Sequence, residues 1–94
     1  MKIIPVTQFG LELDALERTL LENAQTAAAS HLSETDQELL KCILAGDTVT
    51  ISELRKVSRE LSYVFVEKTA DQTAIRNAAA LLGQAVKDIA NETR

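Results

Sequence analysis

Glycine and proline are scarce in this chain, where three glycines and one proline stand among 94 residues. A protein of many strands uses these residue types at its tight turns, so their scarcity disfavours a large sheet and favours long helices. The apolar residues are mainly leucine and alanine, thirteen of each. A chain of this length can bury one modest core. We therefore expect a single all-α domain over residues 1–94, either a four-helix bundle or two packed helical hairpins.

Apolar residues recur at helical spacing in four segments, which predict helices over about 9–30, 34–45, 51–67 and 71–91. The stripe that we expect the first helix to bury consists of Phe9, Leu13, Leu16, Leu20, Ala24 and Ala27. No glycine or proline separates the last two segments before Gly83. One continuous helix over 51–91 therefore stays open as an alternative.

Three helix starts carry capping signals. Ser33 precedes the second segment and can accept a hydrogen bond from a free backbone amide. Thr50 with Glu53 has the spacing of a capping box, in which each side chain satisfies one amide of the other residue. Thr69 with Gln72 has the same spacing, so we place the break between the last two helices near Thr69.

Two glycines and one aromatic residue have expected structural roles. Gly46 should end the second helix, because glycine adopts the left-handed cap without a side-chain penalty. Gly83 should mark a point where another helix crosses closely. Phe65 continues the buried stripe of the third segment, so we expect it in the core.

The first eight residues do not fit a helical pattern and read as an extended, apolar segment. Pro5 lacks the amide that a central strand would need. We expect the segment to lie across the helices, with pairing to another chain as the alternative. Deletion of residues 1–8 should then weaken assembly.

The charges divide unevenly along the chain. The total is 10 Lys and Arg against 14 Asp and Glu, a net charge of −4. Residues 1–50 hold three basic and eight acidic residues, a balance of −5, and residues 51–94 hold seven and six, a balance of +1. An acidic first half repels phosphate and favours solubility or the steering of a basic protein partner.

Catalytic and metal-binding patterns are missing from the sequence. Cys42 is the single cysteine and His31 the single histidine, and one of each is too few for a zinc site. Nothing in the sequence indicates that they lie together as a nucleophile and its base. A lone cysteine permits no internal disulfide, which fits a reducing compartment. No apolar run reaches the length of a membrane span. We expect a cytoplasmic protein that is not an enzyme, with no catalytic residue, cofactor or metal.

The leading functional interpretation is a protein–protein interaction module: a small acidic adaptor, a secretion-type chaperone or an immunity or anti-activator protein. Such a module would bind a helix of its partner or a second copy of itself as a dimer. The partner-binding residues that we expect are apolar residues of the N-terminal segment and one aromatic: Ile3, Ile4, Val6, Phe9 and Tyr63.

A DNA-binding regulator is the alternative, because residues 38–59 resemble the general form of a helix–turn–helix. A short helix, a turn that contains glycine and a helix with basic opening turns follow one another. That resemblance implies contacts with nucleic acid through Ser52, Arg55, Lys56 and Arg59. The connection over 46–50 is longer than the usual turn of the motif, so we prefer a solvated helix face for these residues and consider nucleic acid an improbable partner.

Overall fold

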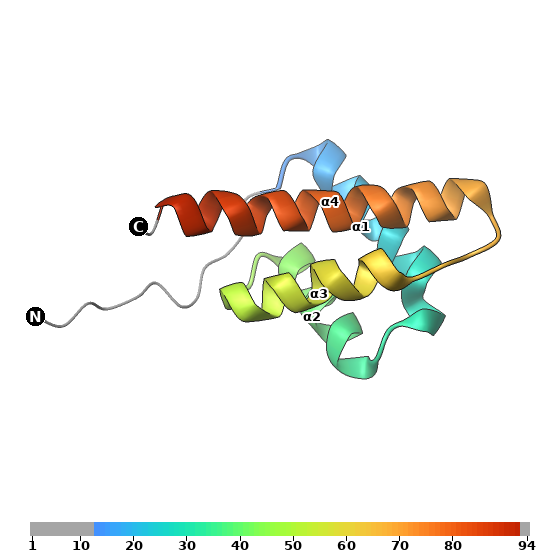
Figure 1. Ribbon diagram of the computed structural model, residues 1–94, viewed down its shortest axis with the longest axis horizontal. Helices are drawn as coiled ribbons and strands as arrows, with labels where there is room; N and C mark the ends of the chain where they lie inside the picture. Colours follow the sequence, from blue (N-terminus) through green and yellow to red (C-terminus); the bar gives the residue numbers. More distant parts are fainter. Residues whose placement is uncertain (1–12, 93–94) are drawn as a thin grey trace, which may run out of the picture.

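A computed structural model describes residues 13–92 and confirms the all-α fold. Its elements are α1 (Ala15–Ala28), a 3₁₀ turn η1 (Ala29–His31), α2 (Glu34–Ala45), α3 (Ile51–Tyr63) and α4 (Thr69–Glu92). The region 51–91 therefore forms two helices. In Figure 1, α3 runs toward the connection over residues 64–68, and α4 returns antiparallel beside it.

The long helix α4 is the centre of the packing. Its most extensive contacts are with α3 on one side and with α1 on another, whereas α2 packs less extensively on α1 and α3. Figure 1 shows α3 alongside α4, with α1 behind α4. The residues that α4 buries are spaced three and four apart, as one helix face requires: Ile75, Ala78, Ala79, Leu82 and Val86.

The other helices supply matching apolar faces. Those of α1, α2 and α3 bury Leu21, Ala24, Ala28, Leu40, Ile43, Leu54, Val57 and Leu61. Small residues let α3 and α4 approach closely, as expected at Gly83. A Cβ atom there would lie 3.3 Å from the Ser58 hydroxyl oxygen, and that hydroxyl donates a hydrogen bond of 2.9 Å to the carbonyl of Ala79.

The local signals at α2 and α3 are confirmed. The Ser33 side chain accepts a hydrogen bond from the amide of Asp36, which caps α2. Thr50 and Glu53 form the expected capping box, with distances of 2.8 and 3.1 Å. Gly46 ends α2 in the left-handed region at φ 81°.

The first helix begins later than the apolar pattern predicts. Asp14 has extended backbone angles and caps α1, and its capping box with Glu17 closes the first turn. Within the described residues, α1 therefore starts at Ala15 and does not extend back toward the predicted start near residue 9, because the pair Asp14 and Glu17 satisfies the free amides at this point.

The boundary between α3 and α4 also differs from the prediction. Helix α3 ends at Tyr63, four residues early, and Val64 is extended. The carboxamide of Gln72 bridges the connection: it accepts from the amide of Val66 at 2.7 Å and donates to the carbonyl of Val64 at 3.1 Å. Gln72 is thus engaged with the connection rather than in a capping box with Thr69, which already belongs to the helix.

Two residues expected in the core are exposed. Leu16 is 78% exposed, because it lies about 140° around the helix from the buried Leu21, outside the part of α1 that packs into the core. Phe65 is 72% exposed. It lies in the extended connection, where successive side chains point to opposite sides, and there Val64 is the residue that turns inward.

The N-terminal expectations lie outside the described residues. The extended segment 1–8 and the four candidate contacts Ile3, Ile4, Val6 and Phe9 all precede Leu13, where the description begins.

The two leucines of α1 offer a matched test of this packing. Leu21→Ala should lower the free energy of unfolding by about 2–5 kcal/mol, because it leaves a cavity between α1 and α4. Leu16→Ala should change it by no more than about 0.5 kcal/mol, since its side chain is already in water. Urea unfolding followed by circular dichroism measures both. Equal losses for the two variants would contradict this orientation of α1.

Candidate functional site

A groove follows the junction of α1 and α4. It has a volume of about 640 Å³. One wall consists of Glu17 in α1 and Leu13, which directly precedes the cap of that helix. The α4 wall consists of Asn77, Ala80, Leu81, Gln84, Ala85, Asp88 and Ile89.

A second hollow of about 300 Å³ continues the same junction toward the start of α4. Asn77 borders both hollows, so they adjoin. The second hollow is lined by Leu16, Thr19, Leu20, Asn23, Ala70, Thr73, Ala74 and Asn77. We call the two together the α1–α4 groove. The exposed side chain of Leu16 forms part of the apolar wall of this groove.

The charges of the α1–α4 groove are all negative. Glu17 and Asp88 line it, and no lysine or arginine does. The Glu17 carboxylate accepts from the amide of Asp14, and the Asp88 carboxylate accepts from the Gln84 side chain at 3.0 Å. Neither carboxylate has a cation as its partner within residues 13–92. The groove therefore combines apolar surface with an uncompensated negative charge.

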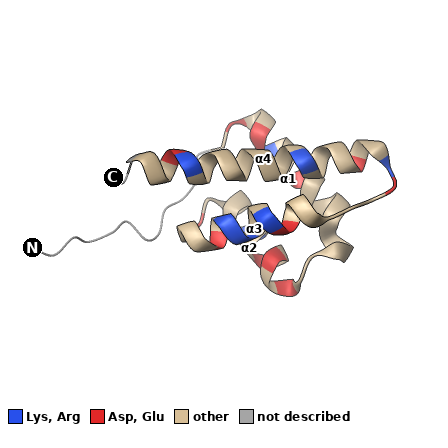
Figure 2. Cartoon of the chain, viewed as in Figure 1, with Lys and Arg blue, Asp and Glu red and all other residues tan. Residues whose placement is uncertain are grey.

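A third hollow, of opposite charge, lies between α3 and α4 and has a volume of about 480 Å³. We call it the arginine hollow, since Arg55, Arg59 and Arg76 line it together with Ser58, Ser62, Ala79 and Ala80. These are three of the four arginines between residues 13 and 92. Figure 2 shows basic segments of α3 beside a basic segment of α4.

The four residues implied by the helix–turn–helix resemblance do not form one surface in the structure, because three of them are exposed and Lys56 is held in an ion pair. Ser52, Arg55 and Arg59 are exposed, and the two arginines meet Arg76. Sequence reasoning missed Arg76. Residue 76 falls opposite the stretch 55–59 only once α3 and α4 form an antiparallel hairpin about residue 66, which no pattern within either segment indicates.

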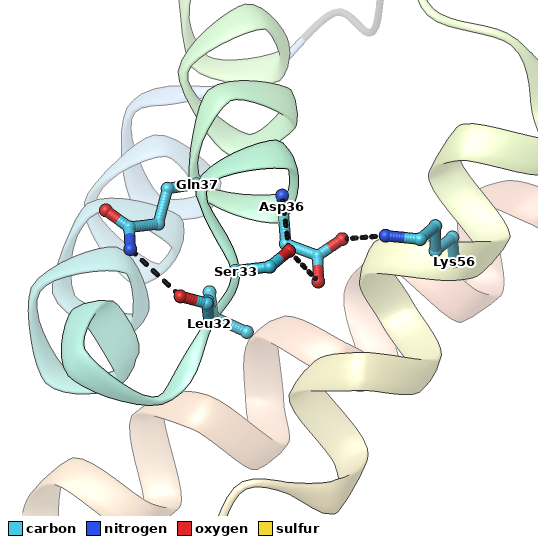
Figure 3. Close-up of polar contacts among 5 residues, drawn as sticks. All are labelled: Leu32, Ser33, Asp36, Gln37 and Lys56. Carbon is cyan, nitrogen blue, oxygen red and sulfur yellow. Dashed lines mark hydrogen bonds and ion pairs between the residues drawn. The ribbon is translucent and has the colours of Figure 1, made fainter.

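Lys56 belongs instead to a structural ion pair. Its ammonium nitrogen lies 2.6 Å from a carboxylate oxygen of Asp36, whose side chain is 5% exposed (Figure 3). Ser33 donates to the other oxygen of Asp36 at 3.1 Å. Next to them, the Gln37 carboxamide donates to the carbonyl of Leu32. Lys56 thus joins α3 to the start of α2.

Tyr63, the one expected partner-binding residue that the structure describes, is 76% exposed. It ends α3 one helical turn after Arg59 and does not line the α1–α4 groove.

Cys42 is half-buried against the core, and His31 is exposed at the end of η1. Within residues 13–92, no three His, Cys, Asp or Glu side chains are grouped as a metal site. No helix in that range is long and apolar enough to cross a membrane.

No family model, curated protein or solved structure matches this chain.

The ion pair of Asp36 and Lys56 gives a test of the assignment of Lys56. Lys56→Met should lower the free energy of unfolding by about 1–3 kcal/mol, because it leaves a buried carboxylate without its cation. The same change at the exposed Arg59 should cost no more than about 0.5 kcal/mol. Thermal or urea unfolding at neutral pH measures both variants. A Lys56→Met protein as stable as Arg59→Met would show that the pair contributes nothing.

Proposed function

We propose that this protein is a non-enzymatic interaction module whose α1–α4 groove binds an amphipathic helix of a basic partner protein. The observation that carries the proposal is the composition of the groove: leucine, isoleucine and alanine side chains beside two carboxylates, with no basic residue. An adaptor, a secretion-type chaperone and an immunity or anti-activator protein all act by such binding. The cytoplasmic location expected from the sequence is part of this proposal.

The length of the groove supports a helix as its occupant. The residues of α4 that line it extend from Ala70 to Ile89. At 1.5 Å per residue that wall is roughly 28 Å long, which matches about five turns of a partner helix. A partner helix docks through apolar residues at positions i, i+3, i+4 and i+7, while its other faces stay polar. Apolar side chains on both walls suit such anchors.

The charges support a basic partner rather than a second copy of this chain. In a two-fold symmetric dimer the same patch meets itself, so Glu17 and Asp88 of one groove would face their copies in the other. Such like-charge contacts disfavour pairing. Lysine or arginine residues on either side of an apolar stripe would instead compensate both carboxylates. The groove thus favours a different protein as its partner over the homodimer that the sequence also allowed.

Calorimetric titration with a designed peptide tests this proposal. The probe is a helix of about 18 residues with leucine at the anchor positions and lysine elsewhere, and its control carries glutamate in place of lysine. We expect the lysine peptide to bind with a Kd of roughly 10 µM, about −7 kcal/mol, and the glutamate peptide at least ten-fold more weakly.

Matched variants locate the binding. Asp88→Lys reverses a charge within the groove and should weaken the lysine peptide at least five-fold. Asp47→Lys makes the same change at an exposed position outside the groove and should alter the affinity less than two-fold. Leu16→Ser should also weaken binding, through the loss of an apolar contact. Equal effects of Asp88→Lys and Asp47→Lys, or no binding of the lysine peptide, would refute the proposal.

A further inference from the structure

The arginine hollow and Tyr63 form a second surface, independent of the α1–α4 groove. Arg55, Arg59 and Tyr63 follow one another at intervals of four residues along α3, so their side chains project from one side of that helix. Arg76 approaches from α4 across the hollow. Two helices thus bring three guanidinium groups together beside an aromatic ring that is 76% exposed.

The three guanidinium groups have no counter-charge among residues 13–92. None of them takes part in an ion pair or donates a side-chain hydrogen bond in that range, whereas Arg18 donates to the carbonyl of Leu44 and Lys56 is paired with Asp36. No acidic residue lines the hollow. The donors of Arg55, Arg59 and Arg76 are therefore available to an anion from outside.

The acidic residues of α3, Glu53 and Glu60, do not line the arginine hollow. Glu53 accepts a hydrogen bond from the amide of Thr50 at the start of the helix. Glu60 follows Arg59 by one residue, which rotates its side chain by about 100° around the helix axis, and it does not line the hollow. It lies three residues before Tyr63, so it neighbours the ring on the side away from the hollow. Figure 2 shows the basic segments of α3 and α4 side by side, with the acidic segments of α2 on the opposite side of α3 from α4. The positive charge is thus local to the junction of α3 and α4.

The donor chemistry of the hollow is that of arginine alone. The hydroxyls of Ser58 and Ser62 already donate to the carbonyls of Ala79 and Arg59, at 2.9 and 2.6 Å. They therefore offer only acceptor lone pairs to a ligand. Each guanidinium group has five N–H donors in a planar fork, a geometry that matches the oxygen atoms of phosphate. A phosphate group is therefore an oxyanion that fits this arrangement.

The exposed ring of Tyr63 indicates which phosphate compound binds. Proteins that bind single-stranded nucleic acid combine a basic groove along the backbone with aromatic side chains on which bases stack. Here Arg59 lies one helical turn before Tyr63 on α3, and Arg55 lies one turn before Arg59. We propose that this surface binds single-stranded nucleic acid, with backbone phosphates in the arginine hollow and one base stacked on Tyr63.

Recognition of a DNA duplex fits the same surface less well. A helix that enters the major groove needs free side chains at its opening turns. On α3, Lys56 is held by Asp36 in this region. In addition, α4 packs along α3 beside the arginines, since Ala79 and Ala80 form part of the hollow. A flexible single strand can follow this shallow surface without inserting a helix into a groove.

Fluorescence anisotropy with a labelled thymidine 12-mer tests the proposal on the full chain. At about 50 mM salt we expect a Kd of tens of micromolar. The plot of log K against log salt should have a slope of about −2, as three phosphate contacts to a single strand predict. A duplex of the same length should bind several-fold more weakly, because its bases are not free to stack on Tyr63.

Substitutions at the exposed residues Arg76 and Tyr63 test the phosphate contact and the stacking contact separately, because neither side chain is part of the core. Arg76→Gln should weaken the 12-mer about five-fold and reduce the slope by about 0.7. Lys87→Gln makes the same charge change on α4 outside the hollow and should alter the affinity less than two-fold. Tyr63→Leu should weaken binding about ten-fold with an unchanged slope, and Tyr63→Phe should preserve it, because a phenyl ring still stacks.

Three results would each overturn the proposal. The first is no binding of the 12-mer at 50 mM salt. The second is an equal loss of affinity in Arg76→Gln and Lys87→Gln, which would indicate diffuse attraction to net charge. The third is full affinity in Tyr63→Leu together with equal or tighter binding of the duplex, which would instead favour a duplex-binding face. Circular dichroism of every variant confirms that the helices are intact.

Discussion

The packing of α4 against both α1 and α3 is the interaction on which the rest of the structure depends. Its buried stripe alternates large and small residues, with Ile75 and Leu82 filling the core and Ala78 and Ala79 between them. The small residues and Gly83 let neighbouring helices approach closely, and the large ones fill the space between them. An amphipathic helix in a small protein is stable mainly because of such packing. Neither α1 nor α3 would bury its apolar face without α4.

The same arrangement produces two surface hollows of opposite character. A helix that packs on two neighbours leaves a furrow along each junction, and the side chains above the core decide the chemistry of each furrow. Along α1 they are leucines and carboxylates, whereas along α3 they are arginines. Ala80 lines both the α1–α4 groove and the arginine hollow. One alanine therefore separates a surface suited to a basic helix from a surface suited to phosphate.

Local signals in the sequence predicted most of the fold. The scarcity of turn residues and the helical spacing of apolar residues are enough for the all-α class, and Ser33, Gly46 and the pair Thr50 and Glu53 place α2 and the start of α3 correctly. These signals act within one or two helical turns, so no tertiary contact is needed to interpret them. The predicted end of α3 was wrong because the β-branched residues after Tyr63 favour an extended connection. The side chain of Gln72 stabilises that connection by hydrogen bonds across it.

The candidate surfaces were less accessible to sequence reasoning. Leu16 belongs to an apolar stripe whichever way α1 is rotated, and its exposure depends on where α4 lies. Arg76 joins Arg55 and Arg59 only once α3 and α4 pair as a hairpin. The sequence alone does not distinguish Lys56 from Arg55 and Arg59, because its ion pair with Asp36 of α2 forms only in the folded protein. Each of these features depends on contacts between helices, which a pattern along one chain does not specify.

An NMR comparison tests most directly whether α4 carries two separate surfaces of opposite chemistry. Uniformly ¹⁵N-labelled protein is titrated separately with the leucine–lysine peptide and with the thymidine 12-mer. We expect two sets of shifted amides that adjoin near Ala80. The peptide should shift those around Leu16, Leu81 and Asp88, and the oligonucleotide those around Arg55, Tyr63 and Arg76. A single common set for both ligands, or shifts spread over the whole surface, would contradict this expectation.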